Sequence, residues 1–286
     1  MQIDRIDLAD LHQPTVIANA IHRQLGRIAP PVPVVDIALA LGIVEVRTDL
    51  FDGFEGMLLT NRVRSFGAIL ANTRHGRRRT RFTIAHELGH FLMERHELSD
   101  DQGFSCQAQD MTETGVARRH MRQEAQANQF AIGLLAPPHL FDPILSGDPN
   151  LRDAQRARDL LDISLEASVR RMVDRRPERL AAVWTKDGQV RYVHRPNGFP
   201  WIHWGPKDFI SKATQAYRAI TNGTRGLTEF SEAHSLTWTD RPDLDLQEQT
   251  RVGRDGHAVT LLHIVTPEDD WDSEGDQAGF SSPGFR

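Results

Sequence analysis

The chain has little cysteine: Cys106 is the single one among 286 residues. One cysteine excludes a disulfide within the chain and is typical of proteins that work in a reducing cytosol. Long apolar runs are also missing, and none approaches the roughly 20 residues that span a bilayer. Residues 1–7 lack the basic and then apolar pattern of a secretory signal peptide. We therefore expect a cytoplasmic protein without a membrane segment.

The sequence also lacks internal repeats and an excess of basic residues. Its formal net charge of −5 argues against general affinity for nucleic acids. One local exception is a run of seven arginines without an acidic residue between Gly56 and His86. We interpret most of these arginines as a solvated loop and helix start. A basic rim for an acidic partner or DNA is the alternative, and DNA is the weaker option because no DNA-binding motif accompanies the run.

The most informative stretch is 81–93, which contains His-Glu-x-x-His at His86, Glu87 and His90. Apolar residues recur at helical spacing around the motif. Residues four apart share one face of a helix, so both imidazoles can point at one metal ion while Glu87 reaches its bound water. Two ordinary helix histidines are the alternative, but unpaired imidazoles are costly to bury on an apolar helix. The pattern predicts a zinc peptidase centre.

A catalytic zinc ion takes a third protein ligand. Glu124 is the best candidate because it opens a second helix with an apolar face, although spacing alone fits a solvated glutamate equally well. Asn128 lies one turn later, where it could hydrogen-bond a ligand histidine and fix its tautomer. His96, Cys106 and His120 lie between the two helices and could also approach the ion. We favour surface or half-buried positions for these three.

The order of these motifs resembles the ImmA/IrrE family of metallo-endopeptidases. The likeness spans about residues 15 to 175 and depends on R-F-T-x-A-H-E-L-G-H at 81–90, E-x-x-A-N-x-F-A at 124–131, F-E-G-M-L at 54–58 and G-A-I-L-A-N at 67–72. The resemblance implies a gluzincin-like site with Glu124 as third zinc ligand. It also implies protein substrates that are helix-turn-helix transcriptional repressors. The C-terminal hundred residues resemble no family.

The pattern of elements predicts an α+β fold with two domains and a tail. Residues 1–178 are expected to form a helical, zincin-like metallopeptidase domain with a small antiparallel sheet of three strands, at 43–47, 54–60 and 65–71. Residues 179–266 are expected to form a smaller α+β domain of unknown role, including a helix over 207–220 and a strand over 235–239. The acidic segment 267–286 is expected to be disordered.

Two further segments carry functional alternatives. Zinc peptidases commonly hold an extended substrate against an edge strand. We expect the strand nearest the catalytic helix to hold the substrate in this way. The candidate substrate-binding residues are therefore Ser65, Phe66, Gly67, Ala68 and Ile69. Two short helices at 150–161 and 164–173 have the layout of a DNA-reading helix-turn-helix. Packing on the catalytic domain is the favoured reading of this pair.

These observations predict a zinc-dependent endopeptidase that cleaves a protein, with a helix-turn-helix repressor as the implied substrate. Cleavage would derepress stress, mobile-element or toxin–antitoxin genes. One alternative is a non-proteolytic regulator that keeps a metal site and acts by binding a repressor or DNA. Another is a toxin–antitoxin component that binds a small helix-turn-helix partner.

Overall fold

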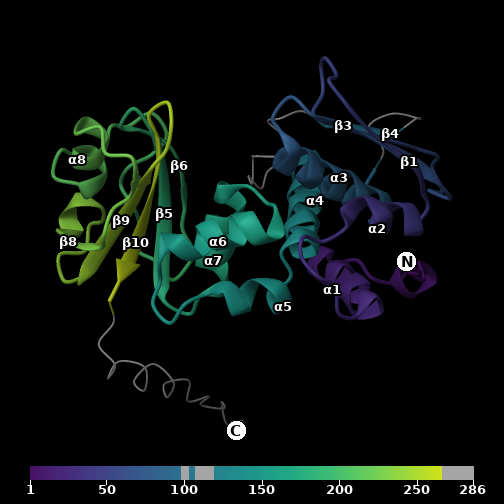
Figure 1. The fold of residues 1–286 in the computed structure, drawn as a ribbon, viewed down its shortest axis with the longest axis horizontal. Helices are drawn as coiled ribbons and strands as arrows, with labels where there is room; N and C mark the ends of the chain where they lie inside the picture. Colours follow the sequence, from purple (N-terminus) through teal and green to yellow (C-terminus); the bar gives the residue numbers. More distant parts are fainter. Residues whose placement is uncertain (98–102, 107–118, 266–286) are drawn as a thin grey trace, which may run out of the picture. The chain divides into compact units, whose positions relative to one another are not determined.

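A computed structural model describes residues 1–97, 103–106 and 119–265. The chain forms two compact units: unit 1 comprises Met1–Asp148 and Arg152–Arg175, and unit 2 comprises Pro149–Leu151 and Arg176–Arg286. The predicted α+β fold class is confirmed, because each unit combines helices with a sheet (Figure 1). The predicted disordered tail, 267–286, lies outside the described residues.

Unit 1 contains a four-stranded sheet with the strand order β1-β3-β2-β4. The strands are β1 (Ile43–Asp49), β2 (Gly56–Thr60), β3 (Gly67–Asn72) and β4 (Gly103–Cys106). The prediction of three antiparallel strands is wrong in two details, because β1 pairs in parallel with β3 and β4 adds a strand beside β2. Parallel neighbours need a connection longer than a hairpin, and β2 lies within that connection.

The helices of unit 1 are stacked on this sheet. They include α1 (Pro14–Leu25), α2 (Val34–Ala40), α3 (Arg77–Leu92) and α4 (Arg119–Leu135), after a short 3-10 helix η1 (Ile6–Leu8). Helix α3 packs against β2 and β3 on one side and against α4 on another, and α4 packs against α1 (Figure 1). As a result every residue of α3 from Thr83 to Leu92 is buried, the polar ones included.

The last part of unit 1 consists of α5 (Pro138–Phe141), η2 (Asp142–Ile144), α6 (Leu151–Leu161) and α7 (Leu165–Arg175). The turn between α6 and α7 places Asp162 against the start of α3. Arg77 Nε lies 2.7 Å from Asp162 Oδ2, and the Nε atoms of Arg78 and Arg81 lie 3.3 Å from the same carboxylate. Three of the seven arginines therefore bind the Asp162 carboxylate, and the turn of the helix pair packs on α3 as favoured.

Unit 2 is built on a sheet with the order β6-β5-β10-β9-β7, and β8 also pairs with β9. The strands are β5 (Arg179–Lys186), β6 (Gln189–His194), β7 (Gly226–Leu227), β8 (Ser231–Ala233), β9 (Leu246–Val252) and β10 (His257–Ile264). Helix α8 (Gln215–Thr221) packs on β9 and β10. Phe199 and Trp238 are the largest side chains of the core beneath them.

Two predictions for unit 2 are wrong. The helix expected over 207–220 begins only at Gln215, because the Thr214 side chain accepts a hydrogen bond of 3.0 Å from Tyr217 N and caps the first turn. The strand expected over 235–239 is replaced by the 3-10 helix η3 (Ser235–Thr237). None of the helices in the described ranges has the length and apolar content that a membrane crossing requires.

Candidate metal centre

The two histidines of the motif meet at one point because α3 carries them four residues apart. Their rings lie 4.8 Å apart between centroids, and the two Nε2 atoms are 3.1 Å from each other. Both side chains are fully buried. A helix end or surface would let each imidazole bond to water, but this buried face of α3 leaves the Nε2 atoms only protein atoms or an ion as partners.

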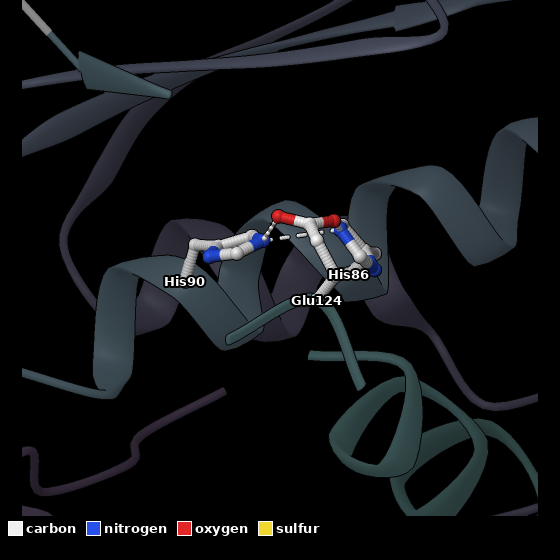
Figure 2. Close-up of side chains that lie close together, drawn as sticks. All are labelled: His86, His90 and Glu124. Atoms are coloured by element: carbon white, nitrogen blue, oxygen red, sulfur yellow. Dashed lines mark hydrogen bonds and ion pairs between the residues drawn. The ribbon is translucent and has the colours of Figure 1, made fainter. Parts of the chain in front are cut away.

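The third member of the group comes from α4. Glu124 Oε2 lies 3.1 Å from His86 Nε2, and Glu124 Oε1 lies 3.2 Å from His90 Nε2. Figure 2 shows the carboxylate facing both imidazole nitrogens. The two helices come this close at Gly89, where an added Cβ would lie 2.9 Å from Phe130 Cδ1 and 3.4 Å from Ala127 Cα. The glycine in the motif therefore lets the second helix approach.

Asn128 fixes the proton on His86. Its Oδ1 lies 3.1 Å from His86 Nδ1, and an amide oxygen only accepts hydrogen bonds, so Nδ1 carries the proton. In the neutral ring Nε2 then has a lone pair, which faces a carboxylate oxygen that also only accepts. Two acceptors at 3.1 Å repel each other unless a cation lies between them. This contact is the first evidence that the residues fit a metal ion.

The spacing of the donor atoms is the second piece of evidence that the residues fit a metal ion. His86 Nε2 and His90 Nε2 are 3.1 Å apart, and each lies close to a different oxygen of Glu124, at 3.1 Å from Oε2 and 3.2 Å from Oε1 respectively. Ligand atoms around a tetrahedral ion with bonds of about 2.0–2.1 Å lie about 3.3–3.4 Å apart. The donor set of two imidazoles and one carboxylate is also one that catalytic zinc uses. The group can therefore bind a metal ion.

Burial sets the protonation of the site. It is the main reason why the pKa of His90 falls to about 4, although the neighbouring Glu124 carboxylate acts in the opposite direction. Burial alone would raise the pKa of the Glu124 carboxyl, but the adjacent imidazoles of His86 and His90 hold it well below its usual range. At neutral pH the group therefore has a neutral His90 and an ionised Glu124, which are the forms that coordinate metals.

Glu87 follows the first histidine and points toward the sheet. Its side chain is fully buried next to Gly56, the first residue of β2. A Cβ added at Gly56 would lie 2.2 Å from Glu87 Oε1 and 2.6 Å from Thr83 Cγ2. The space that Glu87 occupies therefore exists only because residue 56 has no side chain.

The three other candidate metal ligands, His96, His120 and Cys106, differ in where they lie. His96 is buried, and its Nδ1 lies 3.0 Å from His90 Nδ1, the ring nitrogen that faces away from Glu124. Burial and the neighbouring His90 ring lower the pKa of His96 to about 3. His120 is half exposed, with Nδ1 3.9 Å from Glu124 Oε1. Cys106 lies in β4, and its side chain is outside the described part of the structure.

The predicted substrate-binding residues Ser65, Phe66, Gly67, Ala68 and Ile69 do not form an open edge. Strand β3, which begins at Gly67, pairs with β1 on one side and with β2 on the other. Its backbone groups therefore already take part in two ladders, and the two residues before it belong to the loop from β2. The expectation that this strand is an open edge is therefore wrong, because strand order depends on contacts that a linear pattern does not contain.

A buried His-Glu-x-x-His helix with a carboxylate from a second helix defines a centre of the metallopeptidase class. Residues 43–172 match the family model for Peptidase_M78, described as the IrrE N-terminal-like domain. The matched residues contain all the candidate site residues, so this part of the chain is similar to the IrrE N-terminal-like domain. The family supports a metallopeptidase in general terms, without defining the specific activity of this chain.

Two other comparisons concern the whole chain. No curated protein matches it. A solved structure titled "Mycobacterium tuberculosis transcriptional regulator" is similar with a TM-score of 0.56 at 14% identity, covering 87% of this chain and 74% of that chain. At this identity the likeness concerns the fold. Its coverage exceeds the length of unit 1, so the shared fold includes part of unit 2.

Proposed function

We propose that this protein is a zinc-dependent endopeptidase whose metal ligands are His86, His90 and Glu124. The observation that carries the proposal is the buried convergence of these three groups beside Glu87, inside a domain of a peptidase family. Three protein ligands leave a fourth position for water, as in catalytic rather than structural zinc sites.

Glu87 is proposed as the general base and acid. A bound zinc ion would lower the pKa of a coordinated water to about 7 and polarise the scissile carbonyl. The Glu87 carboxylate would take the proton of the attacking water and pass it to the leaving amine. Its burial beside Gly56 limits the positions that the carboxylate can adopt. Asn128 would hold the His86 tautomer whose Nε2 lone pair faces the ion.

Strand β4 replaces β3 in the proposal for substrate binding. Among the described strands it pairs only with β2, and Cys106 is the partner of Gly56, which touches Glu87. An extended peptide added to the open edge of β4 would therefore run close to the centre. Alternate residues of a strand direct their backbone groups to opposite edges. Proline at only one of positions 104 and 105 should abolish cleavage while metal remains bound.

The substrate class follows from the family resemblance. We propose a helix-turn-helix repressor in the cytoplasm, whose cleavage derepresses stress, mobile-element or toxin–antitoxin genes. A non-proteolytic regulator that binds a repressor through an intact metal site is the alternative. The two differ in their need for Glu87, because a binding role does not use a general base.

The test compares wild type with Glu87→Gln in soluble extract of the source cell. New protein N-termini are mapped by mass spectrometry, and zinc is measured in both purified proteins. A protein cut only by wild type, with zinc in both, would support the peptidase and identify its substrate. Repressor control in cells that persists in Glu87→Gln, with no wild-type-specific cuts, would overturn the peptidase in favour of the regulator.

A further inference from the structure

His90 has a partner on the side of its ring that faces away from the proposed metal position. His96 Nδ1 lies 3.0 Å from His90 Nδ1. His96 follows the end of α3, where its backbone N–H donates to Met93 O at 2.9 Å. The guanidinium of Arg64 donates to the backbone oxygens of both Met93 and His96. The backbone that carries the His96 ring is therefore held at three points.

The other nitrogen of His96 bonds to α4. Gln126 Oε1 lies 3.0 Å from His96 Nε2. Gln126 is two residues beyond Glu124, so the helix that supplies the third proposed ligand also contacts the ring behind the second one. Only 4% of the His96 surface is exposed, so neither ring nitrogen depends on water for its hydrogen bond.

The proton positions follow from what each atom can do. The amide oxygen of Gln126 only accepts, so His96 Nε2 carries a proton. A neutral imidazole has one N–H, which leaves His96 Nδ1 as an acceptor. His90 Nδ1 must then donate to it, and the lone pair of His90 is on Nε2. That nitrogen is the one 3.2 Å from Glu124 Oε1.

We propose that Gln126 and His96 form a relay of two hydrogen bonds that sets the tautomer of His90 and directs its Nε2 lone pair toward the metal. Both are positioning residues, since neither faces the side of the ring on which Glu124 lies. The inference depends on the metal centre proposed above and deepens it. Helix α4 would then orient both ligand histidines, His86 directly through Asn128 and His90 indirectly through the Gln126–His96 relay.

The test is the zinc dissociation constant of the purified full-length protein, measured by competition with a chromophoric chelator at one pH. His96→Leu and Gln126→Leu should each weaken zinc binding about 10–100-fold, the usual effect of losing a hydrogen-bond partner behind a ligand. His96→Asn should stay within about threefold of wild type, because the asparagine oxygen takes the place of Nδ1 and accepts from His90. Gln126→Glu should also stay within that range, because a carboxylate accepts from His96 Nε2.

A second readout separates orientation from stability. The visible spectrum of the Co²⁺-substituted protein reports ligand geometry, and it should change in His96→Leu but not in His96→Asn. His22→Leu is the matched control, since His22 is another buried histidine that bonds to α4, 2.8 Å from Leu134 O. It should lower thermal stability without changing the zinc dissociation constant or the cobalt spectrum.

The outcomes separate this inference from the proposed function. Equal zinc binding by wild type and Glu124→Ala would place the metal elsewhere and remove the centre itself. Loss of zinc in Glu124→Ala together with wild-type binding in His96→Leu would overturn the relay alone. Gln126→Glu binding as weakly as Gln126→Leu would reverse the direction of the hydrogen bonds and so also overturn it. If His96→Leu does not fold, the two Gln126 variants decide the question.

Discussion

Gly56 and Glu87 touch across the interface between the sheet and helix α3, and a single added carbon at Gly56 would lie 2.2 Å from Glu87 Oε1. The backbone of β2 thus forms one wall of the space that holds the proposed general base. Gly56 is also the residue that pairs with the end of β4. One glycine therefore connects the proposed substrate edge with the proposed proton acceptor.

Gly56→Ala should lower turnover about 100-fold while zinc binding changes little. The methyl group would displace the Glu87 carboxylate, and a displacement of about 1 Å can reduce a rate by that factor. The three atoms nearest to the new carbon belong to Glu87 and Thr83, and neither residue is a proposed metal ligand. The measurement is kcat on a cleaved substrate together with zinc content. Gly147→Ala, where an added Cβ meets no atom within 4 Å, is the matched control; equal effects of the two changes would contradict the prediction.

Glu87→Gln should retain zinc and lose about 10²–10⁴-fold in kcat, the usual contribution of a positioned acid or base. The amide has the size of the carboxylate, so the packing around Gly56 is preserved while the proton acceptor is removed. Wild-type turnover in this variant would exclude Glu87 from the proposed proton transfers.

Glu124→Ala and Glu124→Gln should both reduce zinc affinity by more than about 100-fold, beyond the 10–100-fold loss typical of residues behind a ligand. The glutamine variant keeps the side-chain volume and removes the charge, so it separates coordination from packing. Zinc content after dialysis is the measurement. Full occupancy in both variants would point to His120, whose Nδ1 is 3.9 Å from Glu124 Oε1.

The metal-free protein should lose stability as the pH falls below about 6.5. The pKa of His90 is about 4 in the folded protein, against 6.5 for an ordinary histidine, so the unfolded chain binds more protons between these pH values. The stability that depends on neutral His90 is complete above pH 6.5 and is lost as the pH approaches 4. The loss is about 3 kcal/mol at most.

Urea unfolding between pH 4 and 8 in the presence of a chelator measures this dependence. His90→Asn should reduce the slope between pH 4 and 6.5, because one of the titrating histidines is absent; His96, with its pKa lowered to about 3, still contributes. The exposed His12 provides the matched His12→Asn control. An unchanged slope in His90→Asn would contradict the prediction.

Asp162→Ala should destabilise unit 1 by about 1–3 kcal/mol, because it leaves Arg77, Arg78 and Arg81 without their shared carboxylate. The destabilisation stays within this range because Arg77 is largely exposed and solvent screens its ion pair with Asp162. Asp162 has φ of +53°, a conformation that asparagine tolerates well. Asp162→Asn therefore isolates the charge, and thermal unfolding of both variants measures the two contributions.

Much of the centre was predictable from sequence because its parts are local. A spacing of four residues places His86 and His90 on one helix face whatever surrounds the helix. The apolar positions around the motif and those after Glu124 predicted α3 and α4. The strands β5, β6, β9 and β10 were predictable for the same reason, since turn residues such as Asp187 separate runs with strand propensity.

The tertiary structure decided everything that depends on which elements become neighbours. Strand order made β3 an interior strand and left β4 at an edge, although the polar stretch around β4 has no strand pattern. The helical pattern of 207–220 became a helix only from Gln215 onward, because Thr214 caps the first turn of α8. The sequence contains no signal that connects His96 with His90 or Gln126, because their spacing matches no metal or helix motif.

By itself the sequence determined the chemistry that this protein has available: two imidazoles, two carboxylates and the helices that carry them. Only the tertiary structure decided that the Glu124 carboxylate faces both imidazoles, that Gly56 makes room for Glu87, and that His96 stands behind His90. Spacing along one helix follows from backbone geometry, whereas contact between elements depends on the packing of the whole unit. In this packing the absence of a side chain at Gly56 and at Gly89 determines which groups can meet.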